Sequence, residues 1–190
     1  LPISTTALKT ILFFTNTGRV YRLKSYQIPE SKRQARGLPI VNLLHLDPEE
    51  YVVGMLEVDK FDEDSYLIMA TSLGQIKKTA MSEYANVHKG GIIAIALREG
   101  DKLIGVDLAD NGHDIVLISR QGLAIRSPES DVRDTGRNTM GVKGMNLSDD
   151  DAVISSLCAD CDDTILVVSE NGFGKRSAID QYRPQKRGGK

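Results

Sequence analysis

The last six residues of the chain, QKRGGK, combine positive charge with a backbone that a ligand can approach closely. Three of the six are cations and two are glycines, which have no side chain to hold a ligand away. Cations beside open backbone N–H groups suit a phosphate chain, because phosphate is anionic and rich in acceptor oxygens. The predicted phosphate contacts of this segment are Gln185, Lys186, Arg187, Gly188, Gly189 and Lys190.

Weaker versions of this segment recur three times upstream, in register with a hairpin glycine. The glycines follow short apolar runs and lie 56, 48 and 50 residues apart, at Gly18, Gly74, Gly122 and Gly172. Four residues after each glycine comes a cation: Arg22, Lys78, Arg126 and Arg176. Fifteen residues after each glycine comes another: Arg33, Lys89, Arg137 and Arg187. Since Lys and Arg make up only 24 of 190 residues, two columns filled in all four copies indicate a true repeat.

Other cations gather in the same parts of the repeat. Lys32 and Arg36 flank Arg33 in the loop PESKRQARG, and Lys175 precedes Arg176 after the fourth hairpin turn. We expect these residues, with both cation columns, to lie exposed along one rim and to contact phosphates. The alternative is that charges simply gather in solvated turns.

The charge distribution supports a polyanion as partner. The net charge is −2, but residues 18–37, 74–93, 122–141 and 172–190 hold 18 of the 24 cations and only 6 of the 26 acids. A positive face on a nearly neutral body is the electrostatic footprint expected for nucleic acid.

The pattern of a complete repeat predicts four short β-strands. In the first unit these are 11–14, 19–23, 40–46 and 51–58, and no segment shows the periodicity of a long helix. About fifty residues and four strands per unit are typical of a propeller-like blade. The sequence therefore predicts one all-β domain over 1–190, with repeats at about 11–58, 66–108, 114–158 and 164–190, the last lacking two strands. Leu1 in place of Met predicts a fragment of a larger protein.

The sequence offers no catalytic or metal-binding constellation. Cys158 and Cys161 form a lone C-A-D-C without the second ligand pair that a zinc site usually needs, so two reduced thiols are expected. There is no phosphate-loop lysine, nucleophile elbow or paired-histidine helix motif.

Six segments resemble the C-terminal domain of the A chain of DNA gyrase, a type IIA topoisomerase, in content, order and spacing. They are LFFTNTGRVYRLKSYQIPE, ARGLPIVNLL, MATSLGQIKKTAMSEY, GGIIAIALREGDKLIGVDL, GVKGMNL and SENGFGKRSAIDQYRPQKRGGK. The resemblance implies a β-pinwheel, a disc of about six propeller-like blades that exchange their outer strands, of which this chain would hold three and a half to four. It also implies duplex DNA wrapping around a basic rim, which gives the parent enzyme its negative-supercoiling bias.

The family's defining box has the form Gln-basic-Arg-Gly-Gly-basic-Gly and normally lies on the first blade. Gln185–Lys190 matches its first six positions but lies on what resembles the fifth blade. The resemblance further implies a cytoplasmic, nucleoid-associated A2B2 assembly with the gyrase B subunit, in which ATP and magnesium bind outside this chain. Two alternatives are the equivalent domain of topoisomerase IV, a decatenating enzyme, and a protein-binding propeller; QKRGGK favours gyrase over topoisomerase IV.

Overall fold

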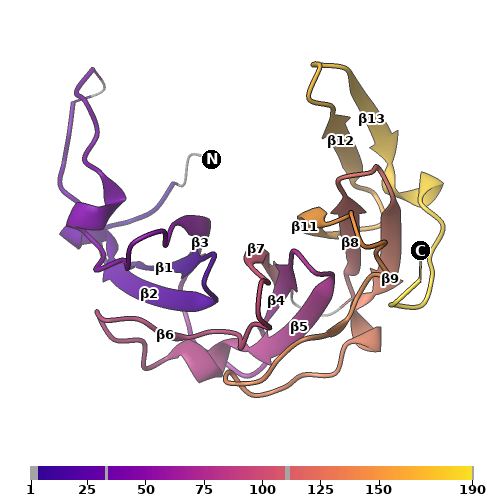
Figure 1. Ribbon diagram of the computed structural model, residues 1–190. Helices are drawn as coiled ribbons and strands as arrows, with labels where there is room; N and C mark the ends of the chain where they lie inside the picture. The colour runs from indigo at the N-terminus through magenta and orange to yellow at the C-terminus, as the bar shows by residue number, and fades with distance from the viewer. Residues whose placement is uncertain (1–3, 33, 110–111, 190) are drawn as a thin grey trace.

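The computed structural model describes residues 4–32, 34–109 and 112–189, and the described chain contains thirteen β-strands, five short 3-10 helices and no α-helix. The four repeat units follow one another along an arc (Figure 1). The predicted all-β fold is confirmed.

Each unit begins with a β-hairpin built on an apolar strand. In unit 1, β1 (Thr10–Thr15) is buried throughout and pairs antiparallel with β2 (Arg19–Lys24). The turn requires a glycine, because Gly18 has a φ of +76° and a Cβ there would lie 2.6 Å from the carbonyl oxygen of Ile95. A third strand, β3 (Val52–Val58), pairs with the other edge of β1.

The fourth strand of each complete sheet comes from the following unit. Strand β6 (Ile92–Ile93) of unit 2 pairs with β2 of unit 1, which gives the order β3-β1-β2-β6. In the second sheet, β10 (Val142–Lys143) of unit 3 pairs with β5 (Gln75–Ala80). The order there is β10-β5-β4-β7, with β4 at Tyr66–Thr71 and β7 at Leu103–Ala109. We call β6 and β10 the exchange strands.

The third and fourth sheets contain fewer strands. The third has the order β11-β8-β9, from Val153–Ala159, Asp114–Ser119 and Ala124–Pro128. The fourth pairs β12 (Thr164–Val168) with β13 (Gly174–Ala178). Unit 4 then returns to the third sheet, where Pro184 forms a bridge with Arg126.

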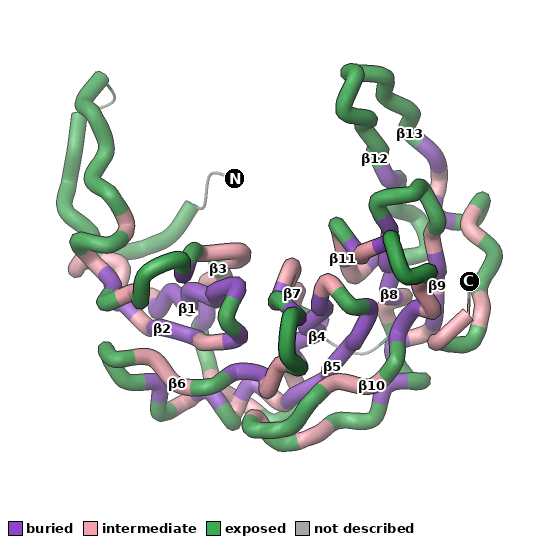
Figure 2. The backbone as a smooth tube through the Cα atoms, in the orientation of Figure 1, coloured by how far each residue is buried: buried purple, intermediate pink, exposed green. Residues whose placement is uncertain are grey.

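The sheets are arranged radially along the arc. Strands β3, β7 and β11 lie on its concave side, whereas the exchange strands lie on its convex side (Figures 1 and 2). The hydrophobic cores lie between neighbouring sheets: Phe14 of the first sheet and Met69 of the second share one core with Ile95, which follows β6. Each unit therefore depends on its neighbours for burial of apolar surface.

The prediction of a strand over 40–46 is wrong. This segment holds a 3-10 helix, η2 (Ile40–Asn42). Its counterparts in units 2 and 3 are the exchange strands, which pair with the sheet of the preceding unit, and no described strand precedes β1. Leu38 and Val41 are accordingly 60% and 57% exposed, whereas Ile95, the counterpart of Val41, is buried.

A 3-10 helix follows the second strand of every unit. These helices are η1 (Ser25–Gln27), η3 (Met81–Tyr84), η4 (Glu129–Asp131) and η5 (Ile179–Gln181). Tyr84 at the end of η3 is fully buried, packs edge-on against Phe14 and donates a hydrogen bond to the Ala94 carbonyl at 3.2 Å. The helices η3, η4 and η5 thus contact the preceding unit, as Tyr84 does in η3.

Candidate nucleic-acid interface

The first cation column joins neighbouring units instead of facing solvent. Lys78 of β5 is buried, and its Nζ lies 2.5 Å from Oε1 of Glu129 in η4 of the next unit. The Nζ also lies 4.1 Å from the centre of the Tyr66 ring, a favourable cation–π contact. The prediction that this column is exposed on the rim is wrong for Lys78, because the repeat places an acid of the following unit against it.

The arginines of the same column make equivalent contacts. Arg22 donates to the carbonyl of Ala85, just after η3, at 2.8 Å. Arg126 donates to the carbonyl of Ile179 in η5 at 2.8 Å and forms an ion pair with Asp114 at 2.5 Å. Both arginines are half-buried, so the exposure prediction is wrong for them as well. This column therefore stabilises the packing of each unit on the next.

Arg176, the fourth member of the column, is exposed, and so is its neighbour Lys175. In the described chain no 3-10 helix of a later unit lies against Arg176. Its exposure agrees with the prediction, whereas its three counterparts pack against the next unit.

The second cation column lies at the outer edge. Lys89 is exposed in the loop that leads into β6. Arg137 donates to the carbonyl of Ile93 on β6 at 2.8 Å, and Arg187 donates to the carbonyl of Lys143 on β10 at 3.2 Å. Because β6 and β10 are the outermost strands, these contacts hold the arginines at the rim. Arg33 lies outside the described residues, while Lys32 and Arg36 beside it are exposed.

The segment Gln185–Gly189 is attached to the third unit by its backbone. The amide of Gln185 donates to the Arg126 carbonyl at 2.7 Å, and the amide of Gly188 donates to the Gly144 carbonyl at 2.6 Å. Gly188 has a φ of +81°, which favours glycine. Lys186 and Arg187 remain exposed, whereas Gln185, Gly188 and Gly189 are half-buried; Lys190 lies outside the described residues.

Lys77, the most buried cation of the described chain, was not predicted from the sequence. Its Nζ donates to the carbonyl of Ala94 at 3.0 Å and to that of Arg137, so it joins β5 to the segment after β6 and to the loop of unit 3. Burial, with a smaller contribution from the nearby Arg137, lowers the pKa of Lys77 to about 8. Lys77 lies three residues after its hairpin glycine, and not every unit carries a cation at that position. The alignment of the repeats therefore gave no signal for Lys77.

A buried acid fixes the hairpin turn of three units. Glu50 accepts hydrogen bonds from the hydroxyls of Thr15, Thr17 and Tyr21 at 2.5, 2.8 and 2.9 Å. Asp101 accepts from the backbone amide of Leu73 at 2.9 Å, and Asp151 accepts from that of Gln121 at 3.1 Å. These acids therefore tie each hairpin turn to the segment that leads into the third strand of its sheet.

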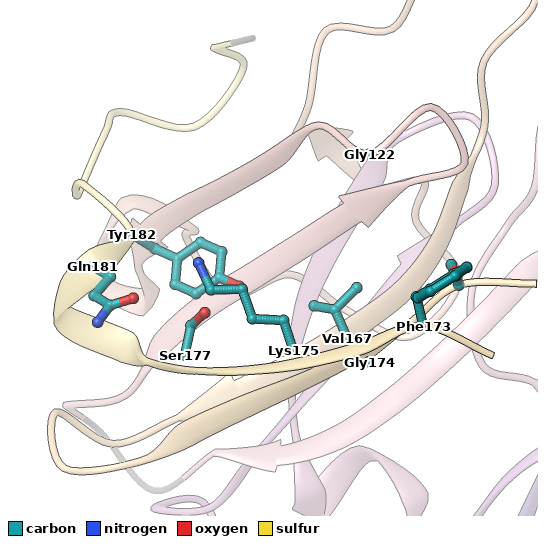
Figure 3. Close-up of a pocket in the computed structure, with 9 residues that line it drawn as sticks. Gly122, Val167, Phe173, Gly174, Lys175, Ser177, Gln181 and Tyr182 are labelled. Carbon is teal, nitrogen blue, oxygen red and sulfur yellow. The ribbon is translucent and has the colours of Figure 1, made fainter. Parts of the chain in front are cut away.

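A cavity of about 480 Å³ lies between the third and fourth sheets. Gly122, Lys175 and Tyr182 are among its lining residues (Figure 3). In the first two sheets the corresponding position is filled by Ile95 and Met145, whose carbonyls lie against the hairpin glycines, whereas a Cβ on Gly122 would meet nothing within 4 Å. The segment that fills this position in the first two sheets has no counterpart among the described residues beside Gly122, so the cavity is no evidence for a ligand site.

Other chemistry is not evident in the described part of the chain. Cys158 is half-buried and Cys161 is exposed, and both are free thiols. Residues 4–32, 34–109 and 112–189 contain no group of three or more His, Cys, Asp or Glu side chains that could hold a metal ion. None of the described helices is long and apolar enough to cross a membrane.

An all-β disc segment whose outer strands are exchanged between successive blades is a β-pinwheel. The family model of the DNA gyrase C-terminal domain, described as a β-propeller, matches residues 9–59, 65–110, 113–160 and 163–190. The chain belongs to this family of DNA gyrase A C-terminal domains.

Individual relatives agree with this assignment. The DNA gyrase A protein of Haloquadratum walsbyi is 46% identical over 186 residues, which cover 95% of this chain and 22% of that protein. A solved C-terminal domain of DNA topoisomerase IV has a TM-score of 0.88 and 25% identity, covering 97% of this chain and 58% of that chain. A solved DNA gyrase A C-terminal domain has a TM-score of 0.80 and 26% identity, covering 97% of this chain and 59% of that chain. The chain thus spans about a fifth of the length of the gyrase A proteins that it matches.

Proposed function

We propose that this chain binds duplex DNA without sequence preference and bends it around its convex rim, which gives a parent DNA gyrase its negative-supercoiling bias. The observation that carries the proposal is the set of rim cations on three successive units. Lys89, Arg137 and Arg187 lie beside the exchange strands, and none of them has an ion-pair partner among the described residues. Their charge is available to an external anion.

The arrangement of these cations suits a bent duplex. Each unit brings charge to the same radial position, so contacts repeat along the arc. Phosphate contacts position DNA without reading its sequence. Bending 20–30 base pairs smoothly by 40–90° costs on the order of 1–6 kcal/mol, and several phosphate contacts that each release counterions can offset that cost.

The test replaces Lys186 and Arg187 together with Ala and measures duplex affinity over a range of salt concentrations. Loss of two phosphate contacts should lower the magnitude of the slope of log K against log salt by about 1.8, at ~0.9 per contact. The control replaces Arg98 and Lys102, which are exposed between β6 and β7, away from the outer edge. An unchanged slope for the Lys186/Arg187 variant would contradict the proposed interface.

The alternative function is that of a topoisomerase IV C-terminal domain. A solved domain of that kind shares this fold, with a TM-score of 0.88. The QKRGGK segment and the 46% identity to a gyrase A protein support gyrase. In a full-length parent, gyrase predicts that the Lys186/Arg187 change reduces supercoiling but leaves ATP-independent relaxation intact. A protein-binding propeller would retain no duplex at any salt concentration.

The remaining partners follow from the same proposal. The gyrase B subunit, together with the rest of the gyrase A protein, would form an A2B2 assembly in the cytoplasm, at the nucleoid. ATP and magnesium would bind to other parts of that assembly, so this chain would contribute no cofactor site and no catalytic residue of its own.

A further inference from the structure

A second, smaller cavity opens at the outer part of unit 1, where the chain of unit 2 crosses it. Its volume is about 200 Å³, below the roughly 300–1,000 Å³ of pockets for drug-sized ligands. It is large enough for a single anionic group but not for a whole nucleotide. Four segments of the chain line it, through Leu23, Gln27, Asn42, Leu43, His45 and Lys89.

The polar groups of this cavity are mainly donors without partners. Asn42, His45 and Lys89 are exposed, and within the described chain their side chains take part in no hydrogen bond or ion pair. Gln27 uses its Oε1 to accept the backbone amide of Lys24 at 2.8 Å, which leaves its Nε2 hydrogens for another acceptor. The described residues place no carboxylate in the cavity wall.

One polar position of this junction differs in charge between the repeats. Gln27 lies nine residues after its hairpin glycine, where units 2 and 3 carry Glu83 and Asp131 and unit 4 carries Gln181. His45 lies before the turn that ends at Glu50, and the structure places no acid of the repeat at its position. Lys89 therefore faces a junction in which an amide, Gln27, stands where units 2 and 3 carry an acid.

We propose that this cavity holds one phosphate group of the DNA backbone, with Lys89 as the cation and Gln27, Asn42 and His45 as hydrogen-bonding partners. The inference rests on the proposed DNA-binding function, in which Lys89 is already a rim cation, and adds Gln27, Asn42 and His45 as partners of the same phosphate. Lysine binds phosphate as a point charge, and Asn and Gln side chains are common donors to backbone phosphates. The remaining lining residues, Leu23 and Leu43, are apolar, so an anion in the cavity would be bound by the polar side chains alone.

The experiment records side-chain NMR signals of Asn42, Gln27 and His45 while duplex DNA or inorganic phosphate is added to the chain. Duplex should shift all three, and Lys89→Ala should abolish those shifts and lower the magnitude of the salt slope of duplex binding by about 0.9. His45→Glu, which adds a carboxylate to the cavity wall, should weaken duplex binding more than His45→Gln. The matched control is Lys60→Ala, an exposed lysine in a cavity of about 220 Å³ that is lined by Glu57, Asp59 and Asp62.

The outcomes separate this site from the proposed function. If the unaltered chain binds duplex but Lys89→Ala keeps its salt slope, the phosphate site is wrong and Lys89 leaves the rim interface, which then rests on Arg137 and Arg187 and is tested separately by the Lys186/Arg187 variant. Shifts with inorganic phosphate but not with duplex would overturn the DNA assignment. If duplex never binds, both proposals fail together.

Discussion

The Nζ atom of Lys78 lies 2.5 Å from Oε1 of Glu129, and the two residues belong to successive units of the repeat. Only 11% of the Lys78 side chain and 2% of the Glu129 side chain are exposed. Water therefore screens this pair poorly, and either charge alone would be costly to keep in place. A residue type that suggests DNA contact in the sequence is used here to join two blades.

Replacing Lys78 with Ala should destabilise the chain by about 3–5 kcal/mol, because it leaves the Glu129 carboxylate buried without its partner. Urea unfolding measures this loss. The double variant Lys78→Met/Glu129→Gln should lose clearly less, since no unpaired charge remains. Equal losses in the two variants would show that the ion pair is not the source of the effect.

Arg126 and Arg176 occupy the same position of the repeat but should respond differently to replacement by Ala. Arg126 is half-buried and bound to Asp114 and Ile179, so its loss should cost several kcal/mol. Arg176 is exposed, and its loss should change the stability by less than about 0.5 kcal/mol. Thermal melting of the two variants side by side tests the comparison, and a large effect at Arg176 would contradict it.

Lys77 should make the stability rise with pH between about 8 and 10.5. Burial lowers the pKa of Lys77 to about 8 in the folded chain, from the ordinary value of 10.5. Between these values the unfolded chain binds more protons than the folded chain, so raising the pH favours folding. The measurement is the free energy of unfolding across this range, and Lys77→Met should reduce the rise. A rise of equal size in that variant would assign it to other groups.

Glu50 should contribute stability that is lost in acid. Burial favours its neutral form, but hydrogen bonds from Thr15, the Asp47 amide, Thr17 and Tyr21 outweigh burial and lower its pKa below 4.5. The contribution is therefore complete above pH 4.5 and declines as the pH falls below it. Glu50→Gln should flatten the stability curve on the acid side of that value. Identical acid curves for both proteins would refute the assignment.

The fold was largely predictable because the repeat and the hairpin signals are local. The glycine at each turn, such as Gly18, is required by a positive φ that the sequence motif already indicates. The exchange strands were expected only from the family resemblance, since β6 has two residues and pairs with a strand about seventy positions earlier. Such pairing leaves no local signal, and for the same reason the segment 40–46 was predicted as a strand of its own unit.

The candidate site was predictable in part. The column of Lys89, Arg137 and Arg187 lies at the outer edge, but the column of Arg22, Lys78 and Arg126 does not face solvent freely. Both columns have the same residue types and periodicity, and only the position of the next unit distinguishes them. Periodicity indicates a shared environment for a column, but it does not say whether that environment is solvent or a neighbouring blade.

The exchange strands also decide what a single backbone cut would do. Lys89 is exposed in the loop before β6, and cleavage after it would separate β4 and β5 of unit 2 from β6 and β7 of the same unit. The piece that begins with Gly90 would still carry β6, which pairs with β2 on the other piece, and β7, which pairs with β4 there. A nicked molecule should therefore migrate as one particle under native conditions and as two fragments in denaturant. The pairing between units would thus hold the two pieces together even though the backbone at that loop is cut.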